Sequence, residues 1–526
     1  MSKLSIAQKY IPKEYTVQEH GRPAQAGDVF SFAVEAHDIK NVTERLYKEH
    51  KLPLLLITAT DERKISGVFK IFYIFGVPSE SVFIMPYITT TKSFPSVTPT
   101  IHEAMLYERK IMSFFGLTPE GHPEPRSIIL HENWPEGVYP LCKDFVWNER
   151  PAQGNAPFTF RTIKGEGIYE LPVGPVHAGI IEPGHFRFHL AGEEILLLEP
   201  RLGYQHKGTE KLFETLPLDR TTALAERISG DSSFSYALLW CQTIEKLASI
   251  EVPARAQYLR TIFAELERLA NHLSDIGAIM TDTGFNFGGA QGSRLREQVM
   301  RTNDRLTGSR FLRGACVFGG VSHDIDKEAA AALAEELEAL RKDLQEVIDI
   351  ADDTLSLYNR LKGTGVLDKK VAFDHGVVGV PLRALGVAAD ARVDHPYAAY
   401  DKLPATIATS EDGDVNARFR VRIDELFTSF EVIQKALEDM PEGAIASTKE
   451  VVLPKNEIAV SIVEGWRGPI VCFATTDENG AIARAAFRDP SFLNWEALGY
   501  AGAGNMVPDF PLINKSFNLS YSSNDL

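Results

Sequence analysis

A long amphipathic helix is predicted after Asp326, and it constrains the fold more than any other segment. Apolar side chains recur there at spacings of three and four residues, at Leu333, Leu337, Leu340, Leu344 and Val347. Residues at these spacings share one face of an α-helix. Because such a stripe has to be covered by other elements, the pattern predicts a long helix within a bundle.

The remaining pattern predicts an α+β fold. Short apolar runs bounded by turn residues indicate strands before residue 150, with an antiparallel hairpin joined at Asp61-Glu62-Arg63. Helices are expected over 38–49, near 100–115 and through most of 205–360, and further strands over 185–200, 364–385 and 450–487. We therefore expect a small N-terminal α+β domain, followed by a mainly helical bundle domain with small peripheral sheets.

A domain boundary is predicted close to residue 150. The length of 526 residues exceeds what one hydrophobic core usually supports. The sequence RPAQGNAPFTFRTIKGEG, from 150 to 167, is rich in Pro, Gly and Asn and has no apolar periodicity, which is typical of a linker. We expect one domain over 1–150, a linker over 151–170 and a second domain over 171–526.

The composition excludes several classes of partner. The chain has 55 Lys+Arg against 71 Asp+Glu, a formal net charge of −16, which disfavours binding to nucleic acid or anionic lipid. There is no apolar run of about 18 residues, so we expect no direct membrane span. The cysteines Cys142, Cys241, Cys316 and Cys472 stand alone, which indicates a reducing compartment without a disulfide framework.

Several common active-site motifs are missing. GYQHKGT at 203–209 lacks the lysine followed by Ser or Thr of a phosphate-binding loop. GGAQGS at 288–293 has the wrong glycine spacing and no preceding strand for a dinucleotide site. No HExxH or Cys-x-x-Cys motif occurs, so the usual zinc and iron-sulfur frameworks are excluded for this chain.

One polar cluster lies in GPVHAGIIEPGHFRFH at 174–189. His185, Arg187 and His189 are predicted to share one face of a strand, with two phenylalanines on the other face. Two imidazoles and a guanidinium on one face could offer proton donors to a ligand, but a solvated sheet face is the more ordinary explanation of the pattern. His177 and Glu182 lie in the preceding loop, where ligand contacts often occur.

Two further clusters consist of small polar residues. ERISGDSSFSY at 226–236 leads into an apolar helix, and a capping role for Ser229 or Asp231 explains only part of it. FRDPSFLNW at 487–495 contains Asp-Pro-Ser, which by itself predicts a turn.

Some charged residues on the predicted helices have structural explanations. We expect His272 to be a buried helix histidine bonded to a neighbour, and Glu267 with Arg268 to form a core or interface pair.

These motifs resemble a known family. From Gly174 onward the chain is similar to the large subunit of the membrane-bound, energy-converting (group 4) nickel-iron hydrogenases, as in formate hydrogenlyase, and to the 49 kDa subunit of respiratory complex I. The matching stretches are GPVHAGIIEPGHFRF, RLGYQHKGTEKLFE, AELERLANHL and GGVSHDI. The first 150 residues resemble the complex I 30 kDa subunit, through FPSVT at 94–98, YERKIMSFFGLTPEGHPEPR at 107–126 and PLCKDF at 140–145.

The resemblance implies that a metal site has been lost. In the hydrogenases four cysteines hold the nickel-iron centre as two pairs, one after an arginine early in the domain and one in an Asp-Pro-Cys motif near its end. The corresponding residues here are Ser229 and Ser232 after Arg227, and Ser491 and Asn494 after Asp489-Pro490. Neutral Ser and Asn side chains cannot replace soft anionic sulfur ligands. We therefore expect no metal in this chain and no nickel-iron hydrogen catalysis.

The complex I 49 kDa protein shares this loss, and its vacated cavity is part of a quinone site. The resemblance implies a histidine of the first strand loop and a tyrosine near the early pair at the quinone headgroup. Here the loop offers His177 or His185, and the tyrosine position falls on Gly230. Asp231, Ser229 or His185 are the candidates to supply a proton instead.

Two functional interpretations remain open at this stage. In the first, the chain is a peripheral-arm subunit of a complex I-like or hydrogenase-related oxidoreductase and ion translocase, lining a quinone-type pocket on the cytoplasmic face of the inner (plasma) membrane. The resemblance implies a small iron-sulfur subunit as electron donor and antiporter-like membrane subunits as partners. In the second, the chain is a redox-inert scaffold or coupling subunit of such a complex, which the glycine at 230 favours.

Overall fold

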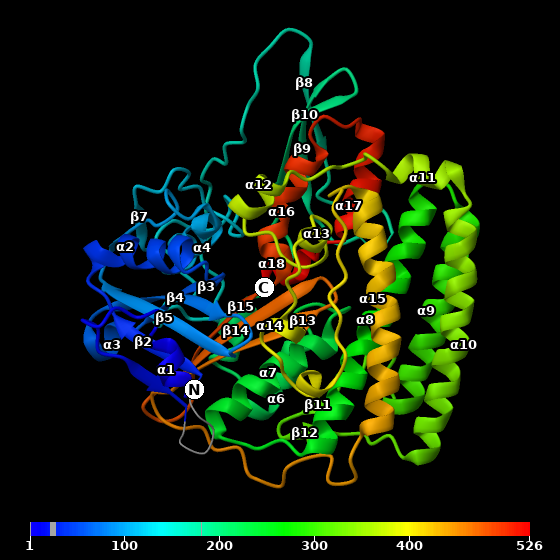
Figure 1. Cartoon of the computed structure of the whole chain (residues 1–526). Helices are drawn as coiled ribbons and strands as arrows, with labels where there is room; N and C mark the ends of the chain where they lie inside the picture. Colours follow the sequence, from blue (N-terminus) through cyan, green and yellow to red (C-terminus); the bar gives the residue numbers. More distant parts are fainter. Residues whose placement is uncertain (1, 22–27, 180) are drawn as a thin grey trace.

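A small sheet in the middle of the molecule lies between an N-terminal α/β part and a bundle of long helices (Figure 1). The structure is a computed structural model and describes residues 2–21, 28–179 and 181–526. The α+β fold class predicted from the sequence is confirmed, because helices and small sheets are combined along the whole described chain.

The N-terminal part is built on a five-stranded sheet. Its strand order is β1-β2-β5-β4-β3, and every neighbouring pair is antiparallel except β2 with β5. The strands are β1 (Gln18–His20), β2 (Val29–Ala33), β3 (Leu54–Asp61), β4 (Phe69–Val77) and β5 (Val82–Thr90). Strands β3 and β4 form the hairpin predicted at Asp61-Glu62-Arg63, and the short helix α3 (Arg63–Ser66) completes the connection.

Helices and short strands complete this part. The predicted helices at 38–49 and 100–115 are confirmed as α2 and α4, with a π-helical turn (Arg45–Glu49) directly after α2. The elements are α1 (Lys3–Ala7), α2 (Ile39–Glu44), α4 (Met105–Phe115), the paired strands β6 (Ser93–Pro95) and β7 (Thr118–Glu120), and 3₁₀ turns at Ala36–Asp38 and His102–Ala104.

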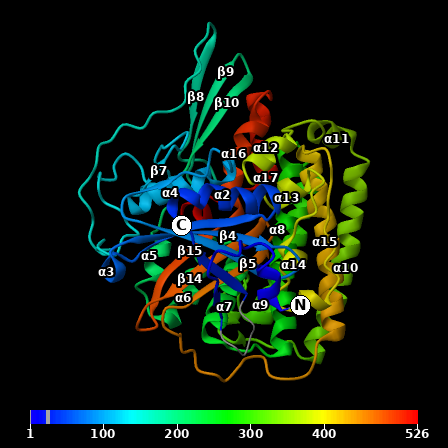
Figure 2. The same ribbon diagram turned by 60° about the vertical axis from the view of Figure 1, so that its left-hand side comes forward.

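An antiparallel ladder projects from one end of the molecule (Figure 2). It has the order β10-β9-β8 and consists of β8 (Ile168–Val173), β9 (His185–Ala191) and β10 (Glu194–Arg201). The strands predicted over 185–200 are thereby confirmed. Residues 151–165 contain no helix or strand, and β8 begins at Ile168, within the predicted linker 151–170.

Long helices form the second half of the molecule. The four longest are α8 (Ala254–Asp282), α9 (Asn286–Thr307), α10 (Lys327–Asp352) and α15 (Val415–Asp439). Helix α10 confirms the amphipathic prediction, because the five apolar positions named in the prediction are buried and the Asp326 side chain accepts a hydrogen bond from the Ala329 backbone N–H. The shorter helices are α5 (Thr209–Phe213), α6 (Leu218–Ala225), α7 (Ser233–Ala248), α11 (Leu355–Leu361), α16 (Pro490–Gly502), α17 (Phe510–Phe517) and α18 (Tyr521–Asp525). Strands β11 (Cys316–Val317) and β12 (Gly320–Val321) and 3₁₀ turns at Tyr400–Lys402 and Val507–Asp509 connect them.

The glycine-rich motif at 288–293 serves helix packing. Gly289 and Gly292 lie on α9 where it crosses Gly277 of α8. A Cβ atom added at Gly292 would lie 2.6 Å from the Gly277 Cα atom, so no other residue fits without moving the helices apart. The motif lies within a helix and lets two helices approach closely.

The prediction of strands at 364–385 is wrong. This segment instead forms α12 (Lys369–Asp374) and α13 (Val380–Arg383), followed by α14 (Ala391–Asp394). The Asp368 side chain caps α12 by accepting from the Val371 N–H. Helix capping and local turns decide the structure of this segment. A prediction from short apolar runs alone does not take them into account.

The central sheet buries both of its faces. It has the order β13-β14-β15, with β13 (Ile458–Gly465), β14 (Gly468–Thr476) and β15 (Ile482–Arg488), and confirms the strands predicted at 450–487. Residues such as Phe473 and Ala486 join the N-terminal core, whereas Cys472 and Ala485 join the bundle core. Phe473 packs on Phe72 of β4 with 5.1 Å between ring centroids. Alternating side chains of one sheet therefore tie both halves together.

A buried carboxylate adds a polar link between the two halves. Glu210 of α5 accepts hydrogen bonds from Lys110 of α4 at 3.0 Å and from Arg484 of β15 at 2.9 Å, and also from the Phe487 N–H at 3.0 Å. Burial raises the pKa of Glu210, but the two cations and the hydrogen bonds outweigh it and lower the pKa to about 2.

Replacing Glu210 is expected to destabilise the protein. Glu210→Ala leaves Lys110 and Arg484 without their shared carboxylate, and breaking a buried ion pair on one side costs about 3–5 kcal/mol. The free energy of unfolding from urea denaturation of the full chain measures this. The matched control is Glu297→Ala, because Glu297 is ion-paired only at the surface, with Arg301 and Arg310. Equal stability of the two variants would contradict the bridging role of Glu210.

Candidate functional site

The topology of the central sheet brings two distant segments together. Strand β15 ends at Arg488, which pairs with Val471 near the start of β14, so the end of β15 lies beside the β13–β14 turn. Arg467 sits in that turn, and Asp489 follows β15 and caps α16 by accepting from the Ser491 N–H at 2.7 Å. Positions 467 and 489–491 thus meet at one end of the sheet.

Serine side chains connect three segments at this point. The Ser229 and Ser520 hydroxyl oxygens lie 3.1 Å apart, and the Ser520 N–H donates to the Ser491 hydroxyl oxygen at 2.9 Å. All three residues are buried. Ser229 and Ser491, each from a different predicted pair, are therefore joined through Ser520. We call Ser229, Ser232, Ser491 and Ser520 the serine cluster.

An ion pair lies beside the serine cluster. Asp231 accepts hydrogen bonds from both terminal nitrogens of Arg467, at 2.9 and 2.7 Å, and from the Ser229 hydroxyl at 2.7 Å. The Ser232 hydroxyl oxygen lies 3.5 Å from Arg467 Nη1. Burial raises the pKa of Asp231, but Arg467 and Ser229 outweigh it, so the net pKa is lowered. Asp231 is thus an ionised acceptor near neutral pH, and its side chain is 38% exposed.

Two predicted site residues lie on the same segments as the serine cluster, but their side chains bond to other parts of the chain. The Asn494 side chain is bonded to the backbone of Val378, accepting from its N–H and donating to its carbonyl at 3.0 Å each. Arg227 is exposed and donates to the Ala223 carbonyl at 2.5 Å. The other predicted residue of the late segment, Asp489, is buried and accepts from the Tyr236 hydroxyl at 2.6 Å.

The two candidate histidines lie on opposite sides of β9. His177 folds back on its own loop, where Nε2 lies 2.7 Å from the Gly184 carbonyl oxygen, and its ring packs on Phe186. Phe186 in turn contacts Trp495, whose indole N–H donates to the Ser520 carbonyl. Two aromatic side chains, Phe186 and Trp495, thus lie in succession between His177 and the serine cluster.

His185 is not brought to the serine cluster. It packs against Phe160, and Nε2 accepts a long hydrogen bond from Arg187 Nε at 3.4 Å. The predicted alternation of β9 is confirmed, since Phe186 and Phe188 pack on Phe510 from the other face. The alternative of a solvated polar face does not hold, because His185 and His189 are both buried beneath neighbouring chain segments.

Several groups of the site were not identified from the sequence. Arg467 and Ser520 belong to no recognised catalytic or ligand-binding motif, so nothing in the local sequence marks them. Glu267 is buried and does not pair with Arg268; it accepts hydrogen bonds from the Phe234 and Ser235 N–H groups at the start of α7. Arg268 instead pairs with Glu265 at 3.2 Å. The prediction that His272 is a buried helix histidine bonded to a neighbour is confirmed, because its Nε2 lies 2.8 Å from a Glu425 carboxylate oxygen.

Two buried carboxyl groups near the serine cluster titrate close to neutrality. Burial raises the pKa of Glu267 to about 7, despite the hydrogen bonds from α7. Burial likewise raises the pKa of Asp525 in α18 to about 6, although the N–H groups of Gly203 and Gln205 donate to it. Unlike Asp231, these groups carry protons that can be given up near pH 7.

The residues present do not fit a nickel-iron centre. The positions where the resemblance implies its four ligands hold Ser229, Ser232, Ser491 and Asn494, and the Arg467 guanidinium lies beside Ser232. All four cysteines are free and buried in other places, and burial raises the pKa of Cys241 well above its ordinary value. Neutral hydroxyls beside a fixed cation cannot hold such a cluster.

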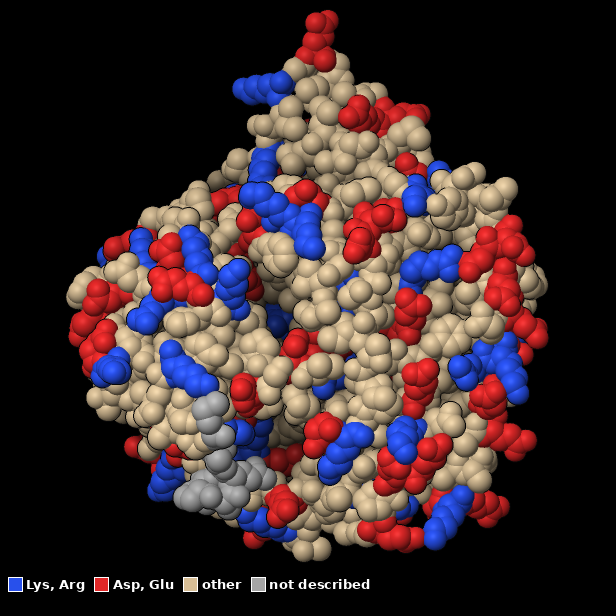
Figure 3. Space-filling model, viewed as in Figure 1, with Lys and Arg blue, Asp and Glu red and all other residues tan. Residues whose placement is uncertain are grey.

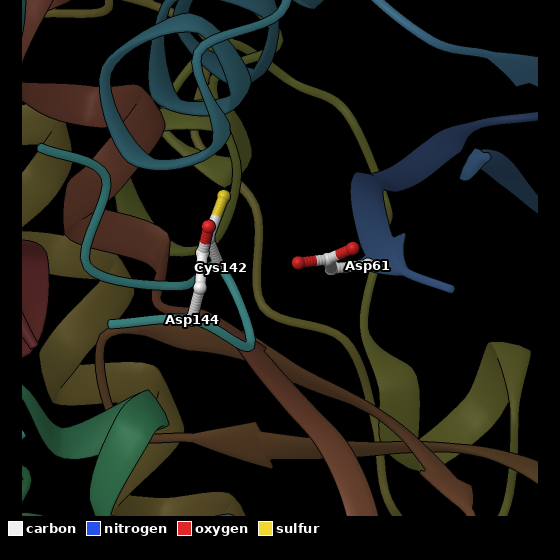
Figure 4. A group of neighbouring side chains, drawn as sticks. All are labelled: Asp61, Cys142 and Asp144. Atoms are coloured by element: carbon white, nitrogen blue, oxygen red, sulfur yellow. The ribbon is translucent and has the colours of Figure 1, made fainter. Parts of the chain in front are cut away.

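Asp61, Cys142 and Asp144 form another group of side chains that could hold a metal ion (Figure 4). Their ligand atoms lie within 4.8 Å of one another, with Asp61 pointing toward the other two. Arg63 forms ion pairs with both carboxylates, at 2.7 Å from Asp61 and 2.9 Å from Asp144. Burial raises the pKa of Cys142 to about 12, so its thiol is protonated. This group is an ion-pair network in which an arginine already supplies the cation.

Comparisons with known proteins cover most of the chain. A family model described as "Respiratory-chain NADH dehydrogenase, 49 Kd subunit" matches residues 275–460 and 445–525, and the corresponding model for the 30 Kd subunit matches residues 32–151. Formate hydrogenlyase subunit 5 of Escherichia coli (strain K12) is 33% identical over 510 residues, which are 95% of this chain and 90% of that protein. The chain belongs to this family of complex I and hydrogenase subunits.

Other relatives extend the similarity to both branches of the family. Hydrogenase-4 component G of Escherichia coli (strain K12) is 32% identical over 530 residues, covering 99% of this chain and 92% of that protein. The C/D fusion protein of the NADH-quinone oxidoreductase of Phocaeicola vulgatus is 31% identical over 393 residues, covering 71% and 75%. These names denote subunits or components of larger assemblies. Within the described residues, no helix is both long and apolar enough to cross a membrane.

The pH dependence of stability is expected to change in Glu267→Gln. The folded-state pKa of Glu267, about 7, lies above the ordinary value of 4.5 for a glutamate, so the folded protein binds this proton more tightly than the unfolded chain. Its contribution to the free energy of unfolding is therefore largest below about pH 4.5 and is lost as the pH rises to about 7. Wild type should lose stability relative to Glu267→Gln, on the order of a few kcal/mol, between pH 5 and pH 8.

Urea denaturation of both full-length chains at the two pH values measures this difference, in which other titrating groups cancel. The exposed Glu335→Gln serves as the control and should follow wild type at both values. A constant difference between wild type and Glu267→Gln would show that Glu267 is not protonated by burial.

Proposed function

We propose that this chain is a metal-free peripheral-arm subunit of a membrane-associated oxidoreductase, in which the serine cluster and the Asp231–Arg467 pair form one wall of a quinone-type redox site. The single observation that carries this proposal is the meeting of Ser229, Ser491 and Arg467 where the hydrogenase relatives would need thiolates. The family supplies the rest: its members include a named NADH-quinone oxidoreductase protein and named hydrogenase proteins.

The chemistry of quinone reduction suits these groups. A quinone takes up two electrons and two protons to become a quinol, and it needs hydrogen-bond donors at its oxygens. Arg467 and the serine hydroxyls are donors, and Asp231 keeps the guanidinium in place. Because Asp231 is ionised, the protons are more readily supplied by Glu267 or Asp525, whose pKa values lie near neutrality.

The electrons come from outside this chain in this proposal. No Cys-x-x-Cys or related cluster motif is present, so we assign the donor to a small iron-sulfur partner subunit. The half-exposed Asp231 and the exposed Gly230 leave this side of the site open to such a partner. We further propose antiporter-like membrane subunits as the remaining partners, with this subunit at the cytoplasmic face of the membrane.

A redox-inert scaffold remains the second candidate, and Gly230 favours it. At this position the complex I 49 kDa protein is expected to carry a headgroup-binding tyrosine, but the chain has no side chain there. A Cβ atom at Gly230 would meet only Arg313 Nη2, at 3.6 Å, so a larger residue has room and its absence is not forced by packing. In a scaffold, the serine cluster would be structural only.

Quinone-dependent activity of the purified native assembly is expected to fall in Arg467→Ala. Losing the guanidinium removes a donor and leaves Asp231 without its partner, so we expect at least about a tenfold decrease in kcat/KM for a soluble quinone, corresponding to about 1.4 kcal/mol. Arg294→Gln, which alters an exposed ion pair with Asp343, is the matched control. Metal analysis of the same assembly should find no stoichiometric nickel in this subunit.

Two outcomes separate the candidate functions. An assembly without quinone-dependent activity, whose partner subunit also lacks paired cysteines, would support the scaffold. Stoichiometric nickel in this subunit would contradict both candidates.

A further inference from the structure

An apolar pocket lies between the N-terminal part and the second half of the molecule. Its volume is about 480 Å³, within the range of about 300–1,000 Å³ typical of small-molecule sites. Figure 3 shows a hollow at this boundary, and the pocket is lined by residues of the turn Arg45–Glu49, of α12 and α14, of the start of β3 and of the end of β15 (Figure 1). Because the pocket is walled by both halves, a ligand there would contact each of them.

Most of the pocket wall is apolar. Side chains from the first half, such as Leu52 and Leu55, face others from the second half, such as Val377, Leu382 and Ile462. Such walls are suited to the hydrocarbon part of a ligand.

A buried cation without a carboxylate partner borders this pocket. Arg488 is only 2% exposed and donates to the backbone carbonyls of Leu55 at 3.1 Å and Pro469 at 2.7 Å. Among the described residues, no carboxylate oxygen lies within 4.0 Å of its nitrogens, whereas Arg383, Arg392 and Arg484, equally buried, each have at least one such partner. Arg109 and Arg418 are also buried without such a partner, but of these three arginines only Arg488 lines the apolar pocket. A buried charge left unpaired is costly, so Arg488 offers a place for an anion.

The other titratable groups at the pocket do not fill that role. Glu103 is the carboxyl group whose charge acts on Arg488; burial raises its pKa to about 7, while Arg488 and Tyr47 oppose the rise. From α14, Asp390 is bound to Arg392, Asp394 accepts from the Asp390 N–H, and burial lowers the pKa of His395 to about 4, so that its ring is neutral. Lys48 and Lys51 of the N-terminal part add positive charge.

We propose that this pocket binds an amphiphilic monocarboxylate, with its apolar tail against the aliphatic walls and its carboxylate on Arg488. The guanidinium matches a carboxylate in charge and in its planar donor geometry. The pocket and the serine cluster share structural elements, because Arg488 directly precedes Asp489 and the pocket residue Val378 is bonded to Asn494. The proposal does not depend on quinone chemistry at the cluster.

Binding of decanoate to the purified full chain tests this proposal by isothermal titration calorimetry at pH 6.5, with decanol and decyltrimethylammonium as neutral and cationic probes of the same tail length. We expect one decanoate per chain and at least about tenfold weaker binding of both other probes. Arg488→Gln should weaken decanoate binding to the level of decanol. Ala389→Phe, which adds a ring to the pocket wall, should abolish binding of decanoate.

The pH provides a test that does not alter Arg488, whose loss could also affect folding. Ionised Glu103 would compete for Arg488 and repel the ligand, so decanoate affinity should fall between pH 6.5 and pH 8.5 in wild type and much less in Glu103→Gln. Arg294→Gln is the control for an arginine away from the pocket. Equal affinity for decanoate and decanol, or full binding by Ala389→Phe, would overturn the proposal.

Discussion

The central sheet β13–β15 has to be covered on both faces, and this requirement organises the molecule. Its alternating side chains belong to two different cores, so the N-terminal part and the helical bundle cannot pack independently of it. The same antiparallel pairing places the β13–β14 turn beside the end of β15. Arg467 and Asp489 meet there for the same reason that the two halves are held together.

The candidate site is a buried network of hydroxyl groups with an ion pair beside it. The hydroxyl groups bond to one another and to a backbone amide, and the positive charge of the site is a guanidinium. Arg467 and Asp231 neutralise each other, so these two charges are balanced within the site.

Several buried ionisable groups of the helical bundle are ion-paired. Glu265, Arg268, Arg392 and Glu425 form ion pairs within the bundle. Arg488 has no such ion pair, and the same holds for the buried Arg109 and Arg418. Of these three arginines, Arg488 is the one that lines the apolar pocket, which is why the carboxylate of a ligand is proposed to bind there.

The sequence by itself determined many of the local elements, and it led to the expectation that Ser229, Ser232, Ser491 and Asn494 stand in place of metal ligands. Periodicity was sufficient for α10 and for the alternation of β9, since both are properties of short segments. It failed at 364–385, where capping by Asp368 prevailed over the apolar pattern. Only the tertiary structure decided that Ser520 joins Ser229 to Ser491, that Arg467 pairs with Asp231 and that His185 faces away. These contacts join residues up to hundreds of positions apart, and no local spacing encodes which distant strand or helix will be their neighbour.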